Sequence, residues 1–129
     1  MNLVLDTSLS PRLARLLDAA LGPAHRVVHA TELAEQATDR MIADHVAAHA
    51  PALIIGMDLD VTAHPHRMAA LKEMGAAVAL LTTDWLTHDP VTQSWMLLRL
   101  MPRLLKKAQV SANPILLVSP GNGGSIRKA

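Results

Sequence analysis

The chain of 129 residues has the length of one ordinary domain, with half of its residues hydrophobic and 18% charged. A large core can therefore be buried, and disorder is not expected. With two Trp, no Phe and no Tyr, the composition argues against an aromatic-rich RNA-stacking surface. Since there is no Cys, disulfides, thiolate metal sites and a Cys nucleophile are excluded.

Charge is unevenly distributed along the chain. Residues 1–64 carry eight acids and four Arg, a net charge of −4, whereas residues 65–129 carry three acids and eight Lys or Arg, a net charge of +5. This asymmetry fits a cation site beside a phosphate-contacting surface, although ordinary solvated helix faces would also produce it. The chain begins in an apolar run without a basic leader, and its apolar runs are shorter than a membrane span. We therefore expect a cytoplasmic protein that does not associate with membranes.

In the first half of the chain, short apolar runs alternate with helical patterns. The predicted elements are, in order, a strand at 2–6, a helix at 10–21, a strand at 25–30, one helical turn capped by Thr31, a helix at 38–50 capped by Thr38, and a strand at 52–58. Ser10 and Pro11 are a typical helix start, and Gly22-Pro23 is a typical helix end. The strand at 52–58 has the strongest apolar pattern in the chain.

The second half continues the alternation. The predicted elements are a helix at 65–74, a strand at 76–81, a long helix from 89 to about 108, a strand at 115–118 and a terminal strand at 125–128. Pro102 should kink or break the long helix. The glycine-rich turn at 121–124 predicts a short C-terminal hairpin. Together these elements predict an α/β three-layer sandwich with a mainly parallel central sheet, formed as a single domain by residues 1–129.

Acidic residues follow two of the predicted strands. Asp6 and Asp58 each come directly after an apolar run, and the carboxyl ends of parallel strands meet at one edge of a sheet. Asp60 lies two residues further on, and Asp39 begins a predicted helix. Clustered carboxylates repel one another unless a cation or a shared proton compensates, and hard oxygen ligands suit Mg²⁺ or Mn²⁺. Each of these Asp residues, taken alone, is more typical of a loop or a helix cap, whereas the pair of Asp6 and Asp58 favours a site.

Polar residues near the same predicted edge could support such a site. Thr82 follows the strand at 76–81, and His64 follows Asp60 closely. Either could face the crevice beyond the strand ends, as a polar support or as a phosphate contact. An exposed loop position is the alternative for His64.

Four segments, in the same order along the chain, resemble PIN-like domains, in particular the toxin-associated branch of that family. Residues 3–17 (LVLDTSLSPRLARLL) resemble its opening strand and helix, and residues 38–42 (TDRMI) resemble its second acidic helix start. Residues 53–61 (LIIGMDLDV) are similar to its strand ending in Asp-x-Asp-Phe. Residues 98–105 (LRLMPRLL) and the basic terminal hairpin resemble the end of the toxin-associated domains.

The resemblance implies a metal-dependent ribonuclease, the toxin of a bacterial toxin–antitoxin pair. Matched position by position, the metal-binding and catalytic acids are Asp6, Asp39 and Asp58, with Asp60 as a fourth metal ligand. Ser8 and Arg12, in the opening motif, are expected near the site or the substrate. The implied cofactor is Mg²⁺ or Mn²⁺, which would activate water for attack on a phosphodiester.

The implied partners are an RNA substrate and a small antitoxin protein. The long helix is apolar over more than one core-facing stripe, at residues 95–105. Part of it could therefore pack against a second copy of the chain or against the antitoxin. Full burial inside one domain is the alternative.

Two other functions remain open at this point. Ser8 stands where the family usually has Asn, Val61 where it has Phe, and Arg40 or Met41 where it has Glu, so the domain could bind RNA or protein without cleaving. A signalling receiver is the second, because Asp58 ends a strand and Thr82 ends the next. A receiver would need a second acid beside Asp6, a Lys after the fifth strand and a closing helix.

Overall fold

A six-stranded sheet forms the middle layer of the protein. The computed structural model describes residues 1–59, 61–110 and 112–129. The strands are β1 (Asn2–Leu5), β2 (Arg26–His29), β3 (Ala52–Met57), β4 (Ala77–Leu81), β5 (Ile115–Ser119) and β6 (Ser125–Lys128). Their order in the sheet is β2-β1-β3-β4-β5-β6, and all neighbours are parallel except β5 and β6, which form an antiparallel hairpin.

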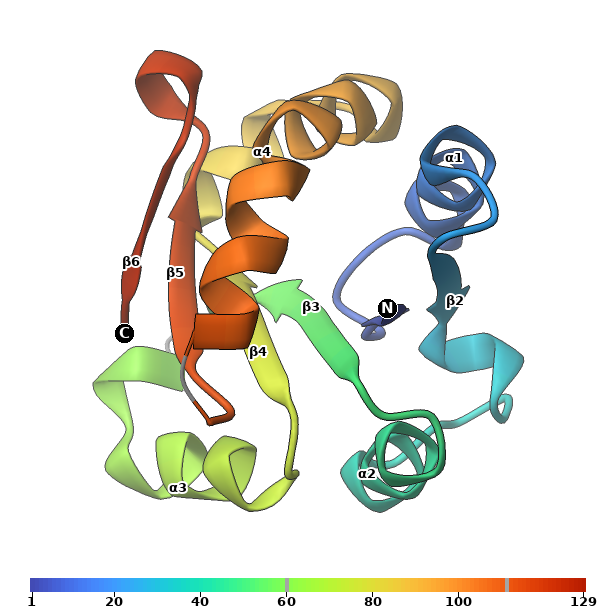
Figure 1. Cartoon of the computed structure of the whole chain (residues 1–129). Coiled ribbons are helices and arrows are strands. Elements are labelled where there is room, and N and C mark those ends of the chain that lie inside the picture. Colours follow the sequence, from blue (N-terminus) through green and yellow to red (C-terminus); the bar gives the residue numbers. More distant parts are fainter. Residues whose placement is uncertain (60, 111) are drawn as a thin grey trace.

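Helices cover both faces of this sheet (Figure 1). They are α1 (Pro11–Leu21), α2 (Asp39–Ala48), α3 (Pro65–Glu73) and α4 (Pro90–Val110), with short 3₁₀ segments η1 (Ala30–Glu32), η2 (Val61–Ala63), η3 (Thr83–Thr87) and η4 (Gly121–Gly123). α1 and α4 pack on one face, and α2 and α3 pack on the other. The predicted three-layer α/β sandwich with a C-terminal hairpin is thus confirmed.

Alternate residues of the inner strands point into different cores, as a sheet covered on both faces requires. In β1, Leu3 and Leu5 belong to the core beneath α1 and α4, whereas Val4 belongs to the core beneath α2 and α3. All three are fully buried. This double burial explains why the strands are continuous apolar runs in the sequence.

The helix start signals are confirmed for α1 and α2. The Ser10 hydroxyl accepts a hydrogen bond from the Arg12 N–H (3.1 Å), and the Thr38 hydroxyl accepts one from the Met41 N–H (3.3 Å). The prediction that Thr31 caps the intervening turn is wrong. The His29 ring accepts the Thr31 N–H there (3.1 Å), so the strand β2 supplies the capping residue.

Pro102 lies inside α4 without breaking it. The helix continues to Val110, and Figure 1 shows its axis changing direction along its length. Because proline has no N–H, the carbonyl of Leu98 lacks its usual helical donor. Pro102 itself is exposed. The apolar breadth of α4 reflects burial in its own domain at Leu97 and Leu100, whereas Trp95 remains 49% exposed.

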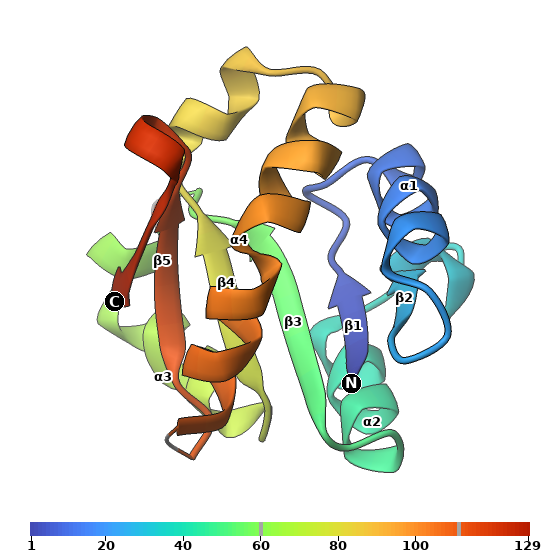
Figure 2. The ribbon, with the colours of Figure 1, turned by 45° about the horizontal axis from the view of Figure 1, so that its top comes forward.

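The connection through α4 has an unusual hand. α3 connects β3 to β4 and α4 connects β4 to β5, so both connections move in the same direction across the sheet. The two helices nevertheless pack on opposite faces. In Figure 2 the parallel strands point upward, α4 lies in front, and the chain steps leftward from β4 to β5. This crossover is therefore left-handed, whereas about 98% of such connections are right-handed.

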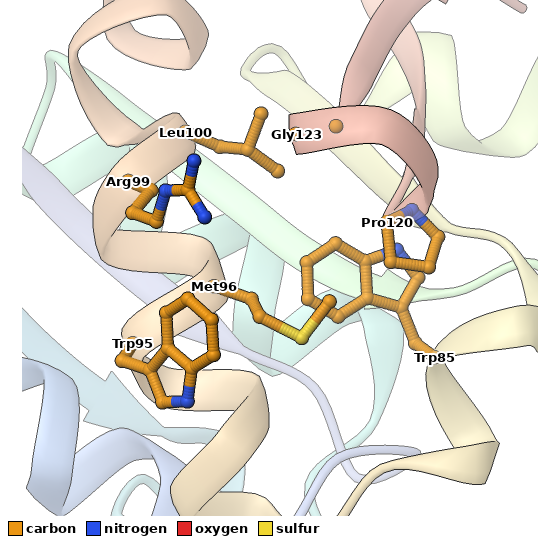
Figure 3. Close-up of a pocket in the computed structure, with 8 residues that line it drawn as sticks. Trp85, Trp95, Met96, Arg99, Leu100, Pro120 and Gly123 are labelled. Carbon is orange, nitrogen blue, oxygen red and sulfur yellow. The ribbon is translucent and has the colours of Figure 1, made fainter.

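Trp85 fixes the segment that makes this crossover possible. Its side chain is fully buried in the core beneath α1 and α4, and its indole N–H donates to the Val118 carbonyl (2.9 Å). The Gln93 amide of α4 donates to the Trp85 carbonyl (2.8 Å). Both contacts tie η3 to the end of β5 and to the start of α4, beside Pro120 (Figure 3).

Within the described part of the chain, no helix combines the length and apolar character needed to cross a bilayer.

Replacing Trp85 should destabilise the fold far more than replacing Trp95. Trp85→Ala removes a fully buried indole and a buried hydrogen bond, so we expect the free energy of unfolding to fall by about 3–5 kcal/mol. Trp95→Ala removes a half-exposed side chain and should cost less than about 1.5 kcal/mol. Urea denaturation of both variants measures the difference. Equal losses would contradict the role assigned to Trp85.

Candidate active site

Three polar residues stand in a row at one edge of the sheet. Asp6, Asp58 and Thr82 are the first residues beyond β1, β3 and β4. Each continues the hydrogen bonding of its strand for one residue: their N–H groups donate to the carbonyls of Ile55 (3.0 Å), Leu81 (2.8 Å) and Val118 (3.0 Å). The prediction that Asp6 and Asp58 lie at the same edge of the sheet is confirmed.

This edge is also the point where the chain changes direction. From β1 the chain passes to β2 on one side, and from β3 it passes to β4 on the other. In open α/β sheets, the connections diverge at such a point and leave a crevice at the carboxyl ends of the two strands. Asp6 and Asp58 follow those two strands.

Ser8 holds the Asp6 carboxylate in place. The Ser8 backbone N–H donates to Asp6 Oδ1 (2.9 Å), and the Ser8 hydroxyl donates to the same oxygen. Ser8 Oγ in turn accepts the Met57 N–H (3.0 Å), which links the loop after β1 to the end of β3. Ser8 therefore fixes the orientation of the Asp6 carboxylate and connects it to the end of β3.

Gly56 provides the space that this carboxylate occupies. A Cβ added at Gly56 would overlap Asp6 Oδ2 and would lie 2.8 Å from Asp6 Cγ. Because the Ser8 bonds fix Asp6 through Oδ1, the carboxylate cannot move aside without losing them. Gly56 is therefore part of the site, which its place within an apolar strand pattern did not indicate.

Burial and a neighbouring acid both disfavour the charged form of Asp6. Desolvation raises the pKa of Asp6, and the charge of Asp39 raises it further. The two hydrogen bonds from Ser8 oppose this rise without cancelling it. Asp6 and Asp39, 33 positions apart in sequence, line the same groove.

Asp6 and Asp39 line one groove between α2 and α3, with a volume of about 300 Å³. Ser8 lies beside them, and Arg67 of α3 faces the groove from the other side. Apolar residues complete the lining: Met57, Leu59, Val61, Ala70, Leu71 and Met74. The Arg67 guanidinium donates to the Leu59 carbonyl (3.2 Å), so the groove places a cationic group opposite two carboxylates.

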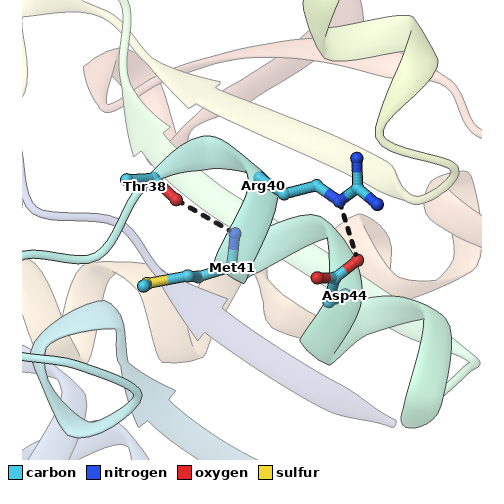
Figure 4. A network of polar contacts seen from close by, with 4 residues as sticks. All are labelled: Thr38, Arg40, Met41 and Asp44. Carbon is cyan, nitrogen blue, oxygen red and sulfur yellow. Dashed lines mark hydrogen bonds and ion pairs between the residues drawn. The ribbon is translucent and has the colours of Figure 1, made fainter.

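The first turn of α2 directs Asp39 and Arg40 to different partners. Asp39 lies in the first turn and lines the groove. Arg40 instead points along the helix surface to Asp44, with Nε 3.2 Å from the carboxylate (Figure 4). Both side chains of that pair are largely exposed, so Arg40 does not neutralise the acids of the groove.

The predicted four-acid cluster is only partly assembled by the described residues. Asp58 is a partly exposed residue between Met57 and Leu59 of the groove lining, and Asp60 lies outside the described residues. Among the described residues, no three His, Asp or Glu side chains are grouped closely enough to hold a metal ion by themselves. A pair of carboxylates nevertheless suits Mg²⁺, which commonly keeps several waters and takes one or two protein carboxylates plus substrate phosphates.

The remaining predicted residues lie in different surroundings. Thr82 has a buried hydroxyl with no hydrogen-bond partner among the described residues, which is uncommon. This hydroxyl lies at the strand edge next to Asp58 and is free to hydrogen-bond a group that binds there. His64 is exposed, precedes α3, and has its ring 5.6 Å from that of His66. Arg12 lies on α1, and its charge lowers the pKa of Asp89, although the hydrogen bonds from Thr92 contribute more. We find no contact that links Arg12 to the groove in the described structure.

His29 is a supporting residue that the sequence did not single out. It is 2% exposed, and its Nε2–H donates to the Leu9 carbonyl (2.7 Å), which anchors the loop carrying Ser8 to β2. In the sequence, the strand that ends at His29 has the same pattern as other short apolar strands, so nothing indicates a role for this histidine. Arg67 was likewise missed, since a single Arg in a helix gives no signal until the helix packs beside the acids.

Comparison with known proteins does not identify the chain. No family model matches it, and no curated protein or solved structure gives a significant match. The fold and groove define it as a doubly wound α/β protein with an acidic crevice at its switch point. Its function must be argued from that crevice.

Replacing the half-buried Asp6 carboxylate by a neutral amide should stabilise the protein at neutral pH. Because the pKa of Asp6 is raised on folding, its favourable contribution is complete below the usual value of 3.8 and is lost as the pH rises through the raised value. Asp6→Asn has no such loss. We therefore expect its Tm to exceed that of the wild type, and to do so by more near pH 7 than near pH 4.

Thermal unfolding at the two pH values, followed by circular dichroism, measures this difference. The matched control is Asp84→Asn, an exposed carboxylate of η3. A Tm difference for Asp6→Asn that does not change with pH would contradict the assigned burial of charge.

Proposed function

We propose that the protein is a Mg²⁺- or Mn²⁺-dependent endoribonuclease whose active site is the groove between α2 and α3. The observation that carries the proposal is the half-buried Asp6 carboxylate, oriented by Ser8 in a groove that Asp39 also lines. Two ionised acids that line one partly desolvated groove repel each other, and a bound cation would relieve that repulsion. Such an arrangement is typical of a site that binds a divalent ion for phosphodiester hydrolysis.

In this proposal Asp6 and Asp39 hold the ion, and Asp58 adds negative charge at the rim. Asp6 Oδ1 is engaged by Ser8, so its other oxygen, Oδ2, would be the ligand. The bound ion would supply Lewis-acid stabilisation of the phosphoryl oxygens and a water of lowered pKa. The chain's own contribution is orientation, since Ser8 and Gly56 together allow one position of the Asp6 carboxylate.

Arg67 completes the site by offering a partner for the phosphate. Its guanidinium lies in the same groove as the two acids, and Arg pairs well with phosphate oxygens through charge-assisted hydrogen bonds. The acids alone would repel an anionic RNA backbone. Arg67 gives the backbone a point of attraction next to the ion.

The biological role that the PIN-like resemblance suggests is that of a toxin neutralised by a small antitoxin protein. Under this proposal the antitoxin, or a second copy of the chain, would contact the exposed apolar residues near the start of α4, Leu86, Val91 and Trp95. Growth arrest on expression of the wild type, but not of Asp6→Asn, would support the toxin role.

RNA cleavage with purified protein tests the proposal directly. We expect the wild type to cleave single-stranded RNA with Mn²⁺ or Mg²⁺, and Asp6→Asn and Asp39→Asn to lose activity by at least about 100-fold. Gly56→Ala should also be inactive, because its Cβ displaces the Asp6 carboxylate. Asp84→Asn is the control for an exposed carboxylate. Equal, negligible cleavage by all of these proteins would remove the nuclease proposal and favour a non-catalytic binding module.

A second prediction separates metal binding from cleavage. Addition of Mn²⁺ should raise the Tm of the wild type, since a ligand that binds only the folded state stabilises it, by about 2.7 kcal/mol at 100 times its Kd. Ser8→Ala removes a positioning hydrogen bond from Asp6 and should weaken the Mn²⁺ response by about 10- to 100-fold in concentration. Thermal shift titrations of both proteins, with Asp84→Asn as control, provide the measurement. The absence of any wild-type shift at millimolar Mn²⁺ would count against the site.

One structural observation favours the receiver alternative, namely the strand order 2-1-3-4-5 that it shares with flavodoxin-like sheets. The chain lacks the other requirements. Asp6 is followed by Thr7, β5 is followed by Ser119-Pro120, and an antiparallel strand stands where a closing helix would be. Incorporation of acid-labile phosphate at Asp58 from a small phosphodonor would reverse this ranking.

A further inference from the structure

The only two tryptophans of the sequence line one cavity, separate from the acidic groove. Figure 3 shows this cavity, of about 210 Å³, between the first half of α4 and the loop after β5. Trp85 lies at its inner side and Trp95 at its outer side, and Met96 extends from α4 between them. In a chain with no other aromatic residues of this size, such a convergence indicates a binding surface.

The inner wall of the cavity is rigid. Trp85 is fully buried, with its indole N–H bonded to Val118. Gly124 packs directly against Leu100, since a Cβ at that glycine would lie 2.8 Å from Leu100 Cγ. The Arg103 guanidinium donates to the carbonyls of Gly123 (3.0 Å) and Gly124 (3.3 Å), which holds the glycine loop against α4. The cavity therefore exists before any ligand binds.

The outer rim combines an aromatic face with a positive charge. Trp95 is 49% exposed, and the Arg99 guanidinium carbon lies 5.7 Å from the centre of its ring. Arg99 is exposed as well. An indole beside an arginine is the combination that stacks on nucleobases while attracting their phosphates.

The cavity lies at the same edge of the sheet as the acidic groove. Trp85 follows β4 and Pro120 follows β5, just as Asp6 and Asp58 follow β1 and β3. β3 and β5 are two strand spacings apart, about 10 Å. A single extended strand of nucleic acid crossing this edge can therefore reach both sites, one on each face of the sheet.

We propose that this cavity binds one nucleobase of single-stranded RNA, stacked on Trp95 with the adjoining phosphate at Arg99. The proposal deepens the proposed function and rests on it for the identity of the strand. Charge complementarity favours a nucleic acid, because Arg99 lines the cavity and Arg103 is held beside it by its hydrogen bonds to Gly123 and Gly124. One half-exposed indole provides a single stacking position, which is compatible with a chain too poor in aromatics for a stacking sheet.

Binding is measured without divalent ions, so that cleavage does not interfere. Labelled hexa-adenylate RNA is titrated with the wild type in EDTA and followed by fluorescence anisotropy. We expect Trp95→Ala to raise Kd by about 5- to 100-fold, the range for loss of one base stack. Arg99→Ala should raise Kd and reduce the slope of log Kd against log salt by about one. The intrinsic emission of Trp85 verifies that each variant is folded.

Two matched controls keep the result specific. Leu86→Ala removes another exposed apolar residue of the same region, and Arg127→Ala removes an exposed cation of β6. Both should leave Kd within about twofold of the wild type. The cavity proposal is overturned if Trp95→Ala binds the hexamer as tightly as the wild type, or if Leu86→Ala weakens binding equally.

The failure of this proposal can be told apart from the failure of the nuclease proposal. RNA cleavage that depends on Asp6, together with a Kd that does not depend on Trp95, overturns the cavity alone. A Kd that depends on Trp95 and Arg99, together with no cleavage by the wild type, upholds the cavity as an RNA-binding site and overturns the nuclease.

Discussion

The site depends on a carboxylate that is kept partly out of water between two strands. Asp6 stands at the end of β1, is bonded through Ser8 to the end of β3, and fits only because Gly56 has no side chain. These features depend on one another. A side chain at position 56 would displace the Asp6 carboxylate, and Ser8 could then no longer bond to both Asp6 and the end of β3. The resulting increase in the pKa of Asp6 is a cost to the folded state that a bound cation would offset.

The sheet topology turns this local arrangement into a groove. Divergence of the chain at β1 and β3 leaves the carboxyl edge uncovered between α2 and α3. The first turn of α2 brings Asp39 to one side, and α3 brings Arg67 to the other. The negatively charged Asp39 and the positively charged Arg67 thus come from helices that are distant in the sequence. Among the contacts described for this part of the structure, the two side chains form no direct ion pair.

Much of this arrangement was predictable from local signals. Apolar runs ending in Asp6 and Asp58 placed both residues at strand ends, and the caps at Ser10 and Thr38 set the helix starts, because these features depend on neighbouring residues. The roles of Gly56 and Arg67 were not predictable, because they arise from contacts between separate elements. The left-handed crossover was also not predictable. Hydrophobic periodicity identifies the buried side of a helix, but it does not indicate on which face of the sheet the helix packs.

The burial of Trp85 also limits how the second cavity can change during evolution. The same indole secures the crossover to α4 and forms the inner wall of the cavity, so a substitution that reshaped the wall would also loosen the chain path. Variation among relatives should therefore concentrate on the helical side, at Trp95, Met96 and Arg99, whose replacement leaves the path intact. The outer wall of the cavity can then vary while the architecture is retained.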